Sequence, residues 1–173
     1  MKKIFLMIAA FGVFSIQASD LKYNIGYVDG DIEVGSVSLG LENITLSVSY
    51  PIEYIEGLSV EAGISEPIGD EKITDGSDVI EYETSGAFLK GIYHFNETFF
   101  VNLNWHYAEL KATLNGVTGK ASDTELGYGV GMALDVPNLG GKIIIGYEVL
   151  DTEWTTGTGI DYDLSEIYLK YQF

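Results

Sequence analysis

His94 and His106 are the only histidines of the chain, and a histidine is the side chain most often used as a general base. Such a base activates a nucleophile only when a hydroxyl or thiol lies beside it and a third group orients the pair. Neither histidine has Ser, Thr or Cys at the next two positions. We therefore expect no catalytic residues and no enzymatic activity.

Gly127, Gly129 and Gly131 have a spacing that superficially resembles a nucleotide-binding loop. A phosphate cradle needs such glycines between a strand and a helix, because the helix N-terminus completes the site. Here the glycines alternate with apolar residues and no helix pattern follows. We expect them to leave room for long side chains on neighbouring strands, and we predict no cofactor.

The segment 66–83 is unusually acidic, with Lys72 as its single basic residue. Oxygen ligands of this kind suit hard cations such as Ca²⁺, but the ordered spacing of a calcium loop is missing, so no metal site is predicted. Two interpretations stay open: a solvated loop, or a surface that contacts other molecules. The acidic residues are Glu66, Asp70, Glu71, Asp75, Asp78, Glu81 and Glu83.

Most of the chain alternates with a period of two, which is the pattern of strands with two unlike faces. Large apolar residues occupy one face, and small, polar or charged residues occupy the other. In Phe99–Tyr107, for example, Val101, Leu103 and Trp105 alternate with asparagines and a histidine. The pattern predicts seven strands at about 43–52, 57–65, 84–95, 98–112, 122–136, 141–153 and 161–173.

An eighth strand is expected within 21–41, but two arrangements fit the residues there. In the first, 21–28 is a strand and 34–52 is one long strand with a bulge at Glu42-Asn43, where the apolar phase slips. In the second, Glu42-Asn43 is a hairpin turn. The bulge is the preferred interpretation.

The N-terminus has the pattern of an export signal. Lys2 and Lys3 precede a short apolar run, and small residues stand at Ala18-Ser19. The run is too short for a membrane helix, which needs about 20 residues. We predict a signal peptide over 1–19 and a single domain over 20–173.

Composition excludes several classes of protein. The formal net charge is −17 and all nine basic residues are lysines, so binding to nucleic acid is not expected. The chain has no Cys and therefore no disulfide framework. It is 46% hydrophobic with 21 Gly, 12 Tyr and only 3 Pro, which leaves a soluble exported β-sandwich or a membrane barrel as the candidates.

Two features favour the barrel. The polar face is rich in Gly, Ser and Asn, as expected of a narrow interior. Aromatic residues also gather at strand ends, where rings are suited to a membrane interface. Those expected at one rim are Tyr50, Tyr54, Tyr93, Phe95, Phe99 and Tyr171, and those at the other are Tyr27, Tyr82, Tyr107, Trp154 and Tyr162. Short turns alternate with longer loops at 66–83, 113–122 and 151–161.

The C-terminal residues Ile167-Tyr168-Leu169-Lys170-Tyr171-Gln172-Phe173 end on Phe with an aromatic residue two positions earlier. In this respect the chain resembles the small eight-stranded outer-membrane β-barrels of Gram-negative bacteria, the OmpA membrane domain, OmpX and Ail group. The resemblance covers 20–173 and implies a closed antiparallel up-and-down transmembrane barrel. It also implies that Leu169, Tyr171 and Phe173 are read by the outer-membrane assembly machinery.

If the apolar face meets lipid, the charged residues lie in the lumen, which in an eight-stranded barrel is only wide enough for side chains to fill. Lys90 and Lys170 are then the expected partners of nearby glutamates. The predicted lumen network, either a structural plug or a gate, is Lys90, Lys170, Glu61, Glu125, Glu148, Glu166 and His106. The wider interior set adds Lys22, Asn24, His94, Asn102 and Asn104.

The leading functional expectation is a monomeric protein that stabilises the envelope or presents its loops outside. Its expected partners are outer-membrane lipid and lipopolysaccharide, with divalent cations bridging the acidic loops to the latter. A small cation-preferring pore is the alternative, suggested by the interior glutamates. A lipid-modifying enzyme is a more remote alternative. Resemblance to the barrel lipases would imply a His-x-Ser pattern, and His106 has no Ser two positions later.

Overall fold

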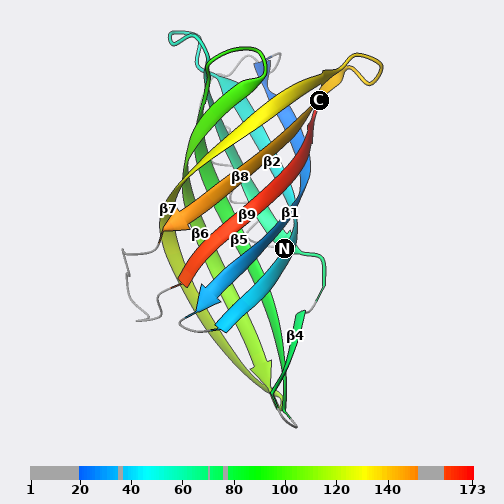
Figure 1. Ribbon diagram of the computed structural model, residues 1–173, viewed down its shortest axis with the longest axis vertical. Coiled ribbons are helices and arrows are strands. Elements are labelled where there is room, and N and C mark those ends of the chain that lie inside the picture. The colour runs from blue at the N-terminus through cyan, green and yellow to red at the C-terminus, as the bar shows by residue number, and fades with distance from the viewer. Residues whose placement is uncertain (1–19, 35–36, 70, 76–77, 152–161) are drawn as a thin grey trace.

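The computed structural model describes residues 20–34, 37–69, 71–75, 78–151 and 162–173, and these residues are almost entirely β-structure (Figure 1). No helix in this described part is long and apolar enough to cross a membrane. The strands are β1 (Lys22–Val34), β2 (Val37–Pro51), β3 (Leu58–Pro67), β4 (Glu71–Asp75), β5 (Asp78–His94), β6 (Phe99–Leu114), β7 (Val117–Val136), β8 (Gly141–Asp151) and β9 (Tyr162–Gln172).

Eight strands close into a barrel, and all of their pairings are antiparallel. β1 pairs with β2 and β2 with β3, and each strand from β5 to β8 pairs with the next along the chain. β3 pairs with β5, and β1 pairs with β9, which completes the cylinder. The short strand β4 lies outside this circle and pairs only with β5. The predicted fold class, a closed antiparallel barrel of eight strands, is confirmed.

The two ends of the barrel differ. Residues 52–57, 95–98 and 137–140 form short connections at the end where β1 begins and β9 ends. Outer-membrane barrels place their short turns in the periplasm and their long connections outside the cell. We name the end that carries these three connections and the start of β1 the periplasmic end, and the opposite end, where β6 and β7 meet in their hairpin, the outer end.

The predicted bulge in the second strand is wrong, and so is the alternative hairpin turn at Glu42-Asn43. β1 and β2 pair in one unbroken register from Lys22↔Ser49 to Val34↔Val37. The apolar phase slips because the inner face of β2 changes character: Leu41 points inward near the outer end, and Ser47 points inward further down. A change of environment along an uninterrupted strand therefore produced the pattern of a bulge.

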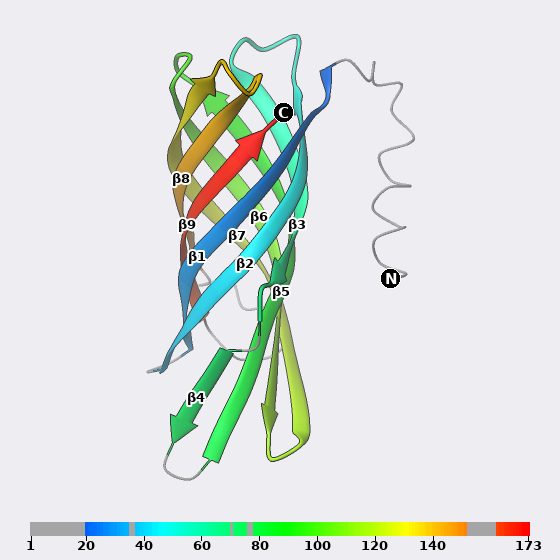
Figure 2. The same cartoon turned by 90° about the vertical axis from the view of Figure 1, so that its right-hand side faces the viewer.

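Strands β4 to β7 extend past the rest of the barrel at the outer end and form a projecting four-stranded sheet (Figure 2). The segments predicted as loops at 66–83 and 113–122 are therefore largely strand. β6 and β7 are joined by Asn115 and Gly116, both with positive φ (50° and 80°). This is the two-residue turn chemistry that tightens a hairpin, because Asn and Gly tolerate the left-handed backbone region.

Candidate functional site

The lumen is centred on a buried lysine–glutamate pair. Nζ of Lys90 lies 2.6 Å from both carboxylate oxygens of Glu148, whose side chain is completely buried. The amides of Asn102 and Asn104 donate to the same carboxylate at 3.0 and 2.8 Å. A buried charge is tolerable only when a counter-charge and further hydrogen bonds satisfy it, and Glu148 has both.

A second buried pair lies beside the first. Nζ of Lys170 is 2.7 Å from Oε1 of Glu61, which also accepts a hydrogen bond from the Ser47 hydroxyl at 2.5 Å. Both ammonium groups stand 4.6 to 4.9 Å from the ring centres of Phe88 and Tyr168. The aromatic faces add cation–π stabilisation to the ion pairs.

The remaining residues of the predicted network lie in the same interior. Glu166 is buried directly opposite Glu148 on the neighbouring strand, and Glu125 is buried directly opposite His106. Within the described residues, neither ring nitrogen of His106 has a hydrogen-bond partner, so no hydroxyl next to it is set up as a nucleophile. The structure thus brings all seven predicted lumen residues into one buried layer.

The glycines of β7 make space for this layer, as the sequence predicted. A Cβ placed on Gly129 would lie 2.5 Å from Cγ of Glu148, and one on Gly131 would meet the Phe100 ring. Gly146 on β8 plays the same part beneath the ring of Tyr168. These positions have room only for a hydrogen atom, so the long side chains can cross the lumen.

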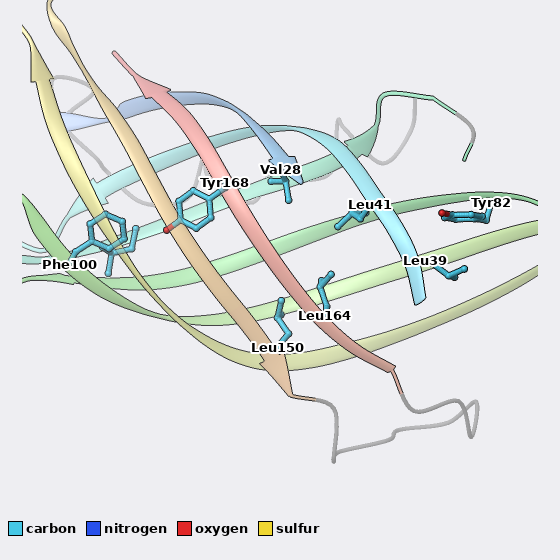
Figure 3. Close-up of a cluster of buried hydrophobic side chains, with 9 residues drawn as sticks. Val28, Leu39, Leu41, Tyr82, Phe100, Leu150, Leu164 and Tyr168 are labelled. Carbon is cyan, nitrogen blue, oxygen red and sulfur yellow. The ribbon is translucent and has the colours of Figure 1, made fainter. Parts of the chain in front are cut away.

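An apolar layer lies above the charged one, towards the outer end. Leu39, Leu41, Leu150 and Leu164 point inward there together with Tyr82, as Figure 3 shows. Tyr82 was predicted to be a rim aromatic facing the membrane, and this prediction is wrong. It points inward because the barrel wall at this height is surrounded by water, and apolar side chains turn to the interior as in a soluble protein.

The outer surface shows the same change of environment. Along β1, Tyr23, Ile25 and Tyr27 are exposed, and they are followed on the same face by Asp29 and Asp31. The last exposed apolar residue is followed by a carboxylate on several neighbouring strands, including Glu42 on β2 and Glu66 on β3. An outward apolar belt is what a lipid-facing barrel requires, and in this protein carboxylates border it towards the outer end.

The projecting sheet has two unlike faces. The face turned away from the barrel axis carries the ion pairs Lys72–Glu81, Lys111–Glu83 and Lys120–Glu109, at 2.8 to 3.0 Å. The hydrogen bond to Glu109 raises the pKa of Lys120 above its ordinary value. The other face is aliphatic, and at its tip Leu114 and Val117 are 40% and 74% exposed.

Other predicted residues lie outside the network. Lys22 is exposed at the periplasmic mouth, and His94 is half-buried there with its ring against Phe100. Leu169 and Phe173 face outward, and Phe173 pairs through its backbone with Tyr23. The predicted signal peptide, Trp154 and the side chain of Tyr162 lie outside the described residues. No group of His, Asp or Glu side chains in the described part could hold a metal ion.

Sequence reasoning missed the aliphatic tip of the projecting sheet. The signal that could have found it is Asn115-Gly116 between two alternating runs, which is a strong local sign of a hairpin. The composition of this run, in which Thr, Gly and Asn dominate, is that of a polar loop and conceals the signal.

Comparisons with known proteins agree with this architecture. No protein-family model matches the sequence, and no curated protein matches it either. Among solved structures, the attachment invasion locus protein Ail of Yersinia pestis, in complex with the heparin analogue sucrose octasulfate, is 16% identical with a TM-score of 0.60, over 88% of this chain and 97% of that one.

Two further structures are similar. Neisserial surface protein A is 12% identical with a TM-score of 0.56, over 88% and 96% of the two chains. A major outer-membrane protein from Thermus thermophilus is 12% identical with a TM-score of 0.53, over 88% and 99%. At such identities the likeness concerns the fold. The chain has the fold of the small eight-stranded outer-membrane β-barrels.

Proposed function

We propose that the protein is a non-catalytic anchor that presents the β4–β7 sheet outside the outer membrane for contact with external surfaces. The observation that carries this proposal is the projecting sheet itself. Its tip exposes Leu114 and Val117 to water, beyond the acidic border of the apolar belt. Leu114 and Val117 are direct register partners and so form one contiguous apolar surface, and exposed contiguous apolar surface is a common property of protein contact sites.

The filled lumen supports an anchor over a pore. An ion would have to pass the two buried lysine–glutamate pairs and then the leucine layer above them. One observation favours a cation-preferring pore: among the described residues, four glutamates and only two lysines are buried. The stacked apolar layer outweighs it, since a dry constriction excludes ions even where charge would attract them.

The acidic outer surface restricts the choice of partner. Asp29, Glu42 and Glu66 border the belt, and the lysines of the projecting sheet are engaged by glutamates. A polyanion would be repelled by this charge distribution. Divalent cations would link the protein to lipopolysaccharide only by diffuse attraction to its acidic residues. The described residues assemble no metal-binding cluster that would hold such a cation at a defined site.

Orientation and display are tested together on intact cells. The chain has no Cys, so Val117→Cys and Glu56→Cys each introduce a single thiol. A membrane-impermeant maleimide should label the first variant on intact cells and the second only after lysis. Labelling of the Glu56→Cys variant on intact cells would reverse the orientation and reject the proposal.

The contact itself is tested with a shortened hairpin. Leu110 and Ala121 are register partners, so joining them through Asn-Gly removes 111–120 and retains a tight turn. At equal surface levels, cells with the full chain should adhere to protein-coated surfaces several-fold more than cells with the shortened chain. Equal adhesion would reject a contact role for the sheet.

A further inference from the structure

A cavity of about 660 Å³ opens at the periplasmic end of the barrel and extends inward to Glu61 and Tyr168. The connections 52–57 and 95–97 form part of its rim. Ligand sites in proteins occupy roughly 300 to 1,000 Å³, so the cavity is large enough for a small amphiphile. The display function proposed above makes no use of this vestibule.

The part of the vestibule wall that β5 to β8 form is apolar, whereas Ser49, Ser59 and Gln172 line the other part. Ile92, Phe100, Ala133 and Ile144 line the apolar part from four strands, and the ring of Tyr168 closes the inner end of the vestibule. Phe100 and Tyr168 point inward at the left of Figure 3. Such a wall favours a hydrocarbon chain, because each methylene that is buried against it leaves water.

Two lysines stand near the mouth on neighbouring parts of the wall. Lys22 on β1 has no ion pair among the described residues, and Lys142 on β8 lies 3.3 Å from the exposed carboxylate of Asp135. The other five described lysines are each within 3.0 Å of a glutamate. Lys22 and Lys142, with His94 nearby, are therefore the cations least neutralised by the protein.

Carboxylates face the vestibule from the opposite arc of the mouth. Glu53 and Glu56 lie on the β2–β3 connection, and Glu97 lies on the β5–β6 connection; all three are exposed. Glu61 lies deeper and is already engaged by Lys170. The mouth thus presents two lysines and the carboxylate of Asp135 on the β8–β9–β1 side and carboxylates alone on the opposite side.

We propose that the periplasmic vestibule binds a single-chain zwitterionic phospholipid. Its phosphate lies at Lys22 and Lys142, its ammonium faces Glu53 and Glu56, and its acyl chain packs against Phe100 and the neighbouring aliphatic residues. A simple anion with an acyl chain satisfies the lysines but leaves the glutamates opposed to its charge. The two-sided mouth is therefore selective for a head group that carries both signs.

The test uses the full chain in lipid nanodiscs. Ser59 lines the vestibule, so Ser59→Cys with an environment-sensitive dye reports on it, and Ser38→Cys at the outer end serves as the control. A short-chain lysophosphatidylethanolamine is added below its critical micelle concentration. The proposal predicts a saturable emission shift at position 59 and none at position 38.

Two pairs of variants assign the charges. Lys22→Gln with Lys142→Gln should weaken binding at least tenfold, whereas Lys120→Gln on the projecting sheet should leave it unchanged. Glu53→Gln with Glu56→Gln should remove the preference for lysophosphatidylethanolamine over lysophosphatidylglycerol. All of these residues are on the surface, and a mobility shift on boiling checks that each variant folds.

Three results would overturn the proposal. The first is equal shifts at positions 59 and 38, which would mean partition into the bilayer only. The second is unchanged affinity after loss of both lysines. The third is equal affinity for lysophosphatidylethanolamine, lysophosphatidylglycerol and a free fatty acid, which would leave only an unselective apolar cavity.

Discussion

Glu148 shows how this barrel tolerates charge in its interior. Its carboxylate receives hydrogen bonds from Lys90, Asn102 and Asn104, so both oxygens are satisfied without water. Because the counter-charge and the amides come from β5 and β6, while Glu148 lies on β8, the cluster forms only when β5, β6, β7 and β8 pair in their native register. The polar centre therefore specifies strand register as well as stability.

Removal of Lys90 tests this role. Lys90→Met should lower the free energy of unfolding by about 3 to 5 kcal/mol, because it leaves an uncompensated carboxylate in the interior. Urea titration of the protein folded in lipid vesicles, followed by gel mobility, measures the change. Lys120→Met is the matched control; its pair with Glu109 is exposed, and such pairs contribute about 1 kcal/mol or less. Equal losses in the two variants would contradict a special role for the buried pair.

The space above the β7 glycines is a second determinant. Gly129→Ala places a methyl group 2.5 Å from Cγ of Glu148, and we expect a loss of about 1 to 3 kcal/mol from overpacking. Gly91→Ala, where a Cβ would meet nothing within 4 Å, should leave stability unchanged or slightly increased. The same urea titration compares the two variants. Equal stability of the Gly129→Ala and Gly91→Ala variants would show that the lumen has free space for a methyl group at position 129.

Strands β5, β6 and β7 serve two environments in succession. Their periplasmic parts form barrel wall, and their outer parts form a sheet that stands clear of it (Figure 2). Loss of the 111–120 tip by the Leu110-Asn-Gly-Ala121 connection should therefore leave the barrel folded. We expect the shortened chain to keep its mobility shift on boiling, because only Ile80–Glu83 of β5 loses its pairing with β6, while the pairings of β6 from Phe99 to Leu110 stay intact. A shortened chain that fails to fold would make the hairpin part of the folding core.

The sequence predicted the parts of each strand that face lipid, because large apolar and small polar residues alternate there without interruption. It also predicted the lumen residues, since they are the other half of the same alternation. It failed where the surroundings change along a strand. Leu39 and Leu41 face inward above the apolar belt. The apolar residues of β2 therefore change from outward to inward positions, while the backbone of the strand continues unchanged. The vestibule was not foreseen either, because its walls come from most of the strands and from two turns.

The barrel as a unit is expected to be closed to ions. The charged layer and the leucine layer fill successive levels of the lumen. In planar bilayers, the refolded protein should give flat current traces at high protein load. Lys170→Ala, which breaks one ion pair, should also stay silent because the apolar layer persists. Regular conductance steps from the unaltered protein would restore the pore as its function.

A lipid-facing barrel requires that the outward face of the strands meets hydrocarbon up to the acidic border. Single spin labels on the outward face of β6, at Leu103 and Trp105 within the belt and at Lys111 and Thr113 above it, measure this directly in lipid vesicles. Oxygen should relax the first two labels more strongly than a water-soluble nickel complex, and the preference should reverse at the last two. If the labels at Leu103 and Trp105 instead met the nickel complex as readily as the one at Lys111, the lipid-facing barrel would be contradicted.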